Sequence, residues 1–182
     1  VLCNSKKVST VLDFKATPLA NSYITTKKEE FFAPLVCIQC DDCKHVQLKY
    51  LVNPKIMFDH YMYVSGTSKV LVNHFKNYAN KIIKKKKLIK KKDKILDIAC
   101  NDGTFLDFFV KKGFKKVVGI EPAKNLKSHN LEKKIDINTI YFNYKNSYKL
   151  KKKYRNFKII TANNVFAHVP DLKDFAMGVK NL

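Results

Sequence analysis

Arginine is almost absent from this chain, and its scarcity bears on whether the protein binds nucleic acid. Arg155 is the only arginine, although 36 of the 182 residues are Lys or Arg and the formal net charge is +21. Arginine is the side chain that usually reads phosphates and guanine through paired hydrogen bonds. A basic chain suggests nucleic-acid binding, but runs of lysine alone are more typical of solvated surfaces. We therefore do not expect specific binding to nucleic acid.

Long apolar runs are missing as well. No stretch approaches the ~18 apolar residues that a membrane-spanning helix needs, and residues 1–10 do not resemble a secretory signal. Hydrophobic residues still make up 46% of the sequence and aromatic residues 12%, which suffices for a buried core and argues against disorder. We expect a cytoplasmic protein that does not interact with membranes.

Five cysteines occur, and three of them are clustered. Two residues separate Cys37 from Cys40 and Cys40 from Cys43, while Cys3 and Cys100 stand apart. In a cytosolic chain such clusters indicate metal or redox chemistry more often than disulfides. Structural zinc usually takes four ligands from two Cys-x2-Cys pairs, and Cys40 with Cys43 forms one such pair. The alternative is a set of buried free thiols, which is also what we expect for Cys100.

The first half of the chain is expected to hold short strands, loops and then helices. The patterns predict a strand at Val11–Phe14, a loop at Ala16–Ser22, a short helix within Asn53–Tyr63 and a longer helix from Ser68 to about Lys90. The lysine run at 84–92 would be the exposed helix end and a linker. We expect three parts: a zinc-binding module at 1–66, a helix and linker at 67–92, and the N-terminal part of a cofactor domain at 93–182.

From Lys94 onward, predicted strands alternate with predicted helices. Strands are expected at Lys94–Ala99, Lys116–Glu121, Asn138–Phe142 and Phe157–Ala162. Helices are expected at Thr104–Lys112, capped by Gly113, from Pro122 to about Leu131, and again near Asp171. This alternation implies right-handed βαβ units and therefore an α/β fold with a parallel sheet.

Three segments at the predicted strand ends are candidates for one ligand site. Open parallel sheets bind ligands beyond the carboxyl ends of their strands, where the turn 97–103, Glu121 and Asn163–Asn164 all fall. An acid at the position of Glu121 can accept hydrogen bonds from ribose hydroxyls. The turn lacks the G-x-G-x-x-G pattern of dinucleotide sites, because Ala99 and Asn101 stand where a methyltransferase loop often has glycines. An adenosyl ligand without phosphates fits better; the alternative is an ordinary α/β turn with a surface acid.

Several of these segments resemble the deoxysugar C-methyltransferase family. The similarity is carried by residues 95–106 (ILDIACNDGTFL), 119–125 (GIEPAKN) and 162–171 (ANNVFAHVPD). Three N-terminal segments are similar too, in the same order: 18–22 (PLANS), 40–48 (CDDCKHVQL) and 58–65 (FDHYMYVS). The resemblance covers essentially the whole chain. It implies a zinc-binding module, a Rossmann-like class I methyltransferase domain and a further C-terminal domain.

Carried over position by position, the resemblance implies a role for each segment. S-adenosylmethionine would be bound by Asp97, Ala99, Asn101, Asp102, Gly103, Glu121, Pro122, Asn163 and Asn164. The methyl acceptor, typically a nucleotide-linked keto-deoxysugar in this family, would face Asn21, Tyr61, Tyr63 and Ser65. Tyr61 and Tyr63 would be catalytic; without the resemblance they would be read as packing aromatics. His168, just after the fourth predicted strand, is a further catalytic candidate.

The resemblance also implies a reaction and a zinc ligand set. In the family a base removes a proton next to the acceptor carbonyl, and the carbanion attacks the methylsulfonium; that base is taken to be a histidine in a C-terminal half that this chain lacks. The implied zinc ligands are Cys3, Cys40 and Cys43. The family's first cysteine pair would begin immediately before Val1, so the fourth ligand is either that residue or Cys37.

These observations predict an S-adenosylmethionine-dependent methyltransferase that acts on a nucleotide-linked sugar. Because the chain starts at Val1 and stops at Leu182, where a helix is beginning, we expect the N-terminal part of a longer enzyme that is inactive alone. Two alternatives stay open at this point. One is a nucleic-acid-binding zinc protein, and the other is a methyltransferase that acts on RNA or on another small molecule.

Overall fold

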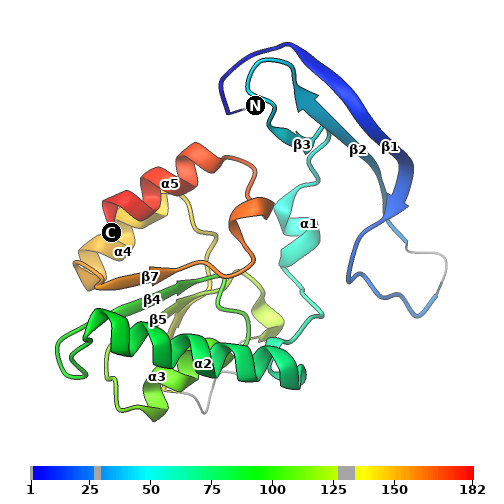
Figure 1. Cartoon of the computed structure of the whole chain (residues 1–182). Helices are drawn as coiled ribbons and strands as arrows, with labels where there is room; N and C mark the ends of the chain where they lie inside the picture. Colours follow the sequence, from blue (N-terminus) through cyan, green and yellow to red (C-terminus); the bar gives the residue numbers. More distant parts are fainter. Residues whose placement is uncertain (1, 27–29, 127–133) are drawn as a thin grey trace. The chain divides into compact units, whose positions relative to one another are not determined.

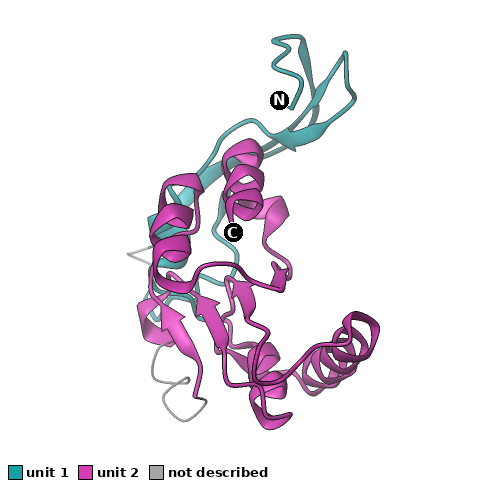
Figure 2. Ribbon diagram, turned by 90° about the vertical axis from the view of Figure 1, so that its left-hand side faces the viewer, with its two compact units in different colours: residues 1–62 teal, residues 63–182 magenta. Residues whose placement is uncertain are grey.

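The computed structural model describes residues 2–26, 30–126 and 134–182, which form two compact units. The first unit is Val1–Met62 and the second is Tyr63–Leu182 (Figure 2). No helix in the described ranges is long and apolar enough to cross a membrane.

The first unit is built on a small antiparallel sheet. Its strands are β1 (Val8–Pro18), β2 (Phe32–Cys40) and β3 (Val46–Leu48), in the order β1-β2-β3. Alternate residues of β2 are buried, as expected for a sheet with one covered face, and the buried set is Val36, Ile38 and Cys40. Helix α1 (Pro54–Phe58) follows, capped by the Asn53 side chain, which accepts a hydrogen bond from the Lys55 N–H.

The second unit contains a parallel sheet of four strands. These strands are β4 (Ile95–Ile98), β5 (Val117–Ile120), β6 (Asp136–Asn138) and β7 (Ile159–Thr161), arranged in the order β6-β5-β4-β7. Along the chain, β5 and β6 are added on one side of β4, and β7 is then added on its other side. The carboxyl end of β4 therefore lies at a topological switch point. The α/β class and the parallel Rossmann-like sheet predicted from the sequence are therefore confirmed.

Helices cover both faces of this sheet (Figure 1). Helices α2 (Lys69–Lys86) and α3 (Thr104–Lys111) lie on one face and share a core with Ile95 and Val117. Helices α4 (Tyr144–Tyr154) and α5 (Leu172–Asn181) lie on the other face and share a second core with Leu96, Ile98, Val118 and Ile120. Both faces of β4 and β5 are thus covered, which is why these strands are continuous apolar runs.

Several predicted boundaries were wrong, each for a local reason. Strand β1 runs through Pro18 into the expected loop, because its end pairs with Phe32 in β2. Helix α2 ends at Lys86, since Lys87 adopts a left-handed backbone with φ of 48°. The predicted end of α3 is confirmed, in contrast, because Gly113 follows this helix with φ of 90°.

The segment after β5 also differs from its prediction. Pro122 does not begin a helix, because the Ala123 N–H turns back to the Glu121 carboxylate; residues 124–126 form only a 3-10 turn. The rest of that predicted helix lies outside the described residues. The third strand was expected at Asn138–Phe142 but ends at Asn138, where the chain turns through a hydrogen bond from the Ile140 N–H to the Asn138 carbonyl. Helix α4 was not predicted.

Candidate functional site

The loop between β4 and α3 has an unusual backbone at every second residue. Ala99, Asn101 and Gly103 have φ values of 53°, 54° and 73°, all in the left-handed region. These are the three positions where a methyltransferase loop often carries glycine. Left-handed backbone costs a non-glycine residue roughly 1–2 kcal/mol, less for asparagine. The sequence therefore keeps the glycine-type loop while replacing two of the glycines.

Asp97 is buried at the carboxyl end of β4. Its Oδ1 atom accepts hydrogen bonds from the Thr161 hydroxyl at 2.6 Å and from the Asn163 side-chain amide at 3.2 Å. Burial raises the pKa of Asp97 to about 7, partly offset by these two hydrogen bonds, and the nearby Glu121 charge raises it further. Strand β7 and the turn that follows it thus contribute one partner each to the acid of β4. Thr161 was missed by the sequence analysis, which considered only the residues after the strand.

Glu121 is buried at the end of β5, with 6% of its surface exposed. Its Oε2 atom accepts the Asn101 N–H at 2.8 Å and its Oε1 atom accepts the Ala123 N–H at 3.0 Å. Burial raises the pKa of this carboxyl, although the hydrogen bonds from Ala123 and Asn101 oppose the rise. A carboxylate has about four acceptor sites, so each oxygen retains room for one more donor. The pair of vicinal hydroxyls of a ribose would fit that capacity.

The same loop binds a segment that lies before α2. The Asn101 side chain accepts the Ser65 N–H at 2.8 Å and donates to the Tyr63 carbonyl at 2.9 Å. The Asp102 carboxylate accepts the Gly66 N–H at 3.2 Å and the Thr104 hydroxyl at 2.6 Å. Two predicted acceptor-facing residues, Tyr63 and Ser65, are thus hydrogen-bonded to one predicted cofactor residue, Asn101.

Gly66 was missed by the sequence analysis. A Cβ atom at this position would lie 2.6 Å from the Asp102 Oδ2 atom and 2.9 Å from the Thr104 Oγ1 atom. Only glycine allows the backbone to approach the loop so closely without displacing these groups. No local pattern in the sequence could have identified it, because Asp102 lies 36 residues further along the chain.

Three of the remaining predicted residues of the second unit follow β7, and Pro122 follows β5. Asn163 is half-buried and donates a hydrogen bond to Asp97, whereas Asn164 is exposed with φ of 55°. His168 is exposed at the end of the short helix η4 (Phe166–His168). Pro122 is half-buried directly after Glu121.

In the first unit, the structure brings together two residues that the resemblance assigned to the acceptor. The Asn21 side-chain amide donates to the Tyr61 hydroxyl at 3.2 Å. Asn21 itself has a left-handed backbone, with φ of 60°, in the turn that follows β1.

Three thiols of the first unit gather at one point. The Sγ atoms of Cys3, Cys40 and Cys43 all lie within 4.8 Å of one another, and Cys3 and Cys40 are 3.5 Å apart. Zinc–sulfur bonds of about 2.3 Å in a tetrahedron place sulfur atoms about 3.8 Å apart, so this donor set fits zinc. Hydrogen bonding from the Cys43 backbone, and less from Asp42, lowers the pKa of Cys40 to about 7 against the effect of burial. A lowered thiol pKa favours the thiolate that binds metal.

Cys37 does not join this cluster. It precedes Cys40 by three residues in β2, and side chains separated by an odd number of residues point to opposite faces of a strand. Among the described residues, the thiols that lie close enough to share a metal are those of Cys3, Cys40 and Cys43. Cys100 is buried in the core of the second unit, as expected.

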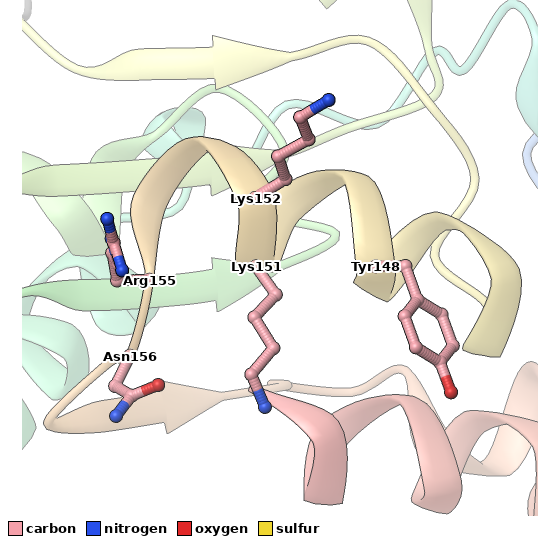
Figure 3. Close-up of a pocket in the computed structure, with 5 residues that line it drawn as sticks. All are labelled: Tyr148, Lys151, Lys152, Arg155 and Asn156. Carbon is pink, nitrogen blue, oxygen red and sulfur yellow. The ribbon is translucent and has the colours of Figure 1, made fainter.

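A surface hollow of about 520 Å³ lies elsewhere, along the last turns of α4. It is lined by Tyr148, Lys151, Lys152, Arg155 and Asn156 (Figure 3). Lys151 and Lys152 point to opposite sides of the helix, and the Lys151 amine donates to the Asn181 carbonyl at 2.6 Å. None of the residues that line this hollow belongs to the strand-end groups around Asp97 and Glu121. The hollow is therefore not part of the candidate cofactor site.

Comparison with known protein families gives two matches in this chain. Residues 1–58 match a family described as "Putative zinc binding domain". Residues 72–179, more than half of the chain, match a family described as "Methyltransferase domain". The first match contains the thiol cluster and the second contains the left-handed loop and Glu121. S-adenosylmethionine and zinc are the cofactors that these matches and the thiol cluster imply.

A curated relative is similar over nearly the whole chain. C-methyltransferase NovU of Streptomyces niveus is 24% identical over 175 residues, which covers 94% of this chain and 41% of NovU. The chain therefore spans about two fifths of the length of this relative.

Proposed function

The chain belongs to the methyltransferase domain family, and from this premise we propose that it serves the S-adenosylmethionine-dependent methylation of a carbon atom in a nucleotide-linked keto-deoxysugar. The sugar acceptor is supported by the resemblance of the segments 18–22 and 58–65 and by the similarity to a C-methyltransferase. The cofactor is supported by one observation above all, the position of Glu121 at the end of β5 with one spare acceptor site on each oxygen.

In this proposal the strand ends bind and orient the cofactor. Glu121 would accept two ribose hydroxyls through charge-assisted hydrogen bonds, while the N–H groups of Asn101 and Ala123 hold its carboxylate in place. The bound cofactor would supply an electrophilic methyl group carried on a sulfonium. Asp97, held by Thr161 and Asn163, would present a carboxyl group to the positive part of the ligand.

The acceptor side of the proposal rests on the resemblance. Asn21, Tyr61, Tyr63 and Ser65 are proposed to contact the sugar, and the two tyrosine hydroxyls and His168 are the candidates for proton transfer. The hydrogen bond between Asn21 and Tyr61 supports a shared role for these two residues. Zinc in the thiol cluster would be structural, because it would fix the chain at Cys3 to the turn between β2 and β3.

The experiment has a binding part and a transfer part. Calorimetry should detect binding of S-adenosylhomocysteine to the chain, with NAD as a negative control. The protein that contains this chain is then incubated with isotopically labelled S-adenosylmethionine and nucleotide-linked keto-deoxysugars, and carbon-bound label in the sugar is sought by mass spectrometry. Absence of binding would refute the cofactor assignment, and label found only on oxygen would refute the assignment of a carbon acceptor.

A further inference from the structure

We propose that Asn101 is a positioning residue, which couples the cofactor site to the backbone of Tyr63 and Ser65; this inference rests on the proposed function of Glu121. The residue has two sets of contacts that point in different directions. Its backbone N–H donates to Glu121 at 2.8 Å. Its side-chain amide spans the preceding segment, since Oδ1 accepts the Ser65 N–H and Nδ2 donates to the Tyr63 carbonyl.

The residue type at this position meets two requirements at once. With φ of 54° the backbone is left-handed, which asparagine tolerates better than most residues. Glycine would tolerate this backbone better still but has no side chain for Ser65 and Tyr63. Asparagine therefore keeps the loop conformation and adds a buried amide with both a donor and an acceptor in use.

A neighbouring contact supports the same arrangement independently. Gly66 lies so close to the loop that a Cβ atom would overlap the Asp102 carboxylate at 2.6 Å, and its N–H donates to that carboxylate at 3.2 Å. Two consecutive N–H groups, those of Ser65 and Gly66, thus end on two consecutive side chains, those of Asn101 and Asp102. Tyr63, Ser65 and Gly66 of the segment 63–66 are thus each hydrogen-bonded to the loop after β4.

The consequence is a short connection between the two parts of the site. A ligand that engages the Glu121 carboxylate acts on the hydrogen-bond partner of the Asn101 N–H, and the Asn101 side chain transmits the effect to the Tyr63 carbonyl and the Ser65 N–H. Filling the cofactor site should therefore restrict opening of the segment 63–66. In this arrangement Asn101 need not contact the cofactor to affect the placement of Tyr63.

Amide hydrogen exchange tests the proposal directly, with S-adenosylhomocysteine as the probe. The variant is Asn101→Gly, which keeps the left-handed backbone and the N–H to Glu121 but removes the amide. In the parent chain, saturating ligand should slow exchange at Ser65 and Gly66. In Asn101→Gly, ligand-free exchange at Ser65 should be about tenfold faster, as expected for loss of one hydrogen bond, and the ligand should no longer slow it. The Ile95 amide, bound to the Lys116 carbonyl, is the internal reference for global unfolding.

A second variant keeps the test informative if Asn101→Gly does not fold. Asn101→Asp retains an oxygen for the Ser65 N–H but loses the donor to Tyr63, so Ser65 should stay protected. Equal protection of Ser65 by the ligand in the parent and in Asn101→Gly would overturn the coupling. Failure of the parent to bind the ligand would instead refute the cofactor assignment, while unchanged ligand-free exchange at Ser65 in Asn101→Gly would refute the contact itself.

Discussion

The Asn101 N–H lies 2.8 Å from the Oε2 atom of Glu121, so the loop after β4 and the acid after β5 are joined by a direct hydrogen bond. The two residues are 20 positions apart in the sequence and meet because their strands are parallel neighbours in the sheet. The bond fixes one oxygen of the carboxylate, and the Ala123 N–H fixes the other. Glu121 is therefore oriented before any ligand arrives.

This orientation makes Glu121 the sharpest mutational target. Glu121→Gln should weaken binding of S-adenosylmethionine by about 1–3 kcal/mol, the range for losing a hydrogen bond to a charged group, and Glu121→Ala should weaken it at least as much. Calorimetry on the protein that contains this chain is the measurement. Asp136→Asn is the matched control, because this acid is exposed and pairs with Lys153. Unchanged affinity in Glu121→Ala would show that the ribose assignment is wrong.

Asp97 should make stability fall with rising pH. Its pKa is about 7 in the folded protein, above the ordinary value of 3.8, so between these values the folded state holds a proton that the unfolded state has lost. The free energy of unfolding therefore decreases as pH rises from about 4 to about 7, by on the order of 3 kcal/mol. Glu121 adds to the same trend, because its pKa is raised as well.

Urea unfolding at about pH 5 and about pH 8 measures this effect. Asp97→Asn removes the ionisable group, so the difference between the two pH values should shrink and the variant should be more stable than the parent at the higher pH. A variant that loses stability at the higher pH would show that the ionised carboxylate of Asp97 stabilises the ligand-free fold.

The strands that were predicted well are those whose residues are buried on both faces. Strands β4 and β5 are continuous apolar runs, and such runs are visible in a sequence. Strand β6 has only three residues and is defined by its pairing with Val118–Ile120. The residues of β6 themselves show no strand pattern from which this pairing could be predicted. Helix α4 was missed because its five lysines obscure the few positions that it buries, Ser147 and Leu150.

Some residues of the candidate site could likewise be predicted from the sequence, and others could not. Asp97 and Glu121 could be predicted because acids at the ends of parallel strands converge on one edge. Gly66 and the contacts of the segment 63–66 could not, because their partners are 36 residues away or more, and backbone N–H donors leave no signature in the residue type. The exclusion of Cys37 from the thiol cluster likewise required the strand that places it on the opposite face.

The left-handed loop predicts opposite effects for two substitutions. Ala99→Gly relieves strain at φ of 53° but makes the unfolded chain more flexible, so stability should change by between zero and about +1 kcal/mol. Gly103→Ala introduces that strain at φ of 73° and should destabilise the protein by about 1–2 kcal/mol. Thermal unfolding of both variants is the measurement. Destabilisation by Ala99→Gly of the same size as by Gly103→Ala would contradict the strain argument.

The lysine-rich edge of the sheet should not act as a specific nucleic-acid site. Lys94, Lys116 and Lys158 lie together at the amino ends of neighbouring strands, because the Ile95 N–H binds the Lys116 carbonyl and the Lys158 N–H binds the Lys94 carbonyl. Lysine charges of this kind bind phosphates weakly and without sequence preference. Fluorescence polarisation with two unrelated duplexes should show equal affinities that fall steeply between about 50 and about 200 mM salt. Tight binding to one duplex at the higher salt would refute this.

Zinc should bind through Cys3, Cys40 and Cys43, and Cys37 provides the matched control. Cys40→Ser or Cys43→Ser removes a thiolate from the cluster, so the protein should lose its metal and its first unit should lose structure, because zinc contributes directly to folding. Cys37→Ser changes a thiol on the opposite face of β2 and should retain about one equivalent of zinc. Elemental analysis after purification and after refolding with zinc is the measurement. If Cys37→Ser loses zinc as Cys40→Ser does, the ligand set is different from the one described; if the parent holds less than about a tenth of an equivalent after refolding, the cluster is not a zinc site.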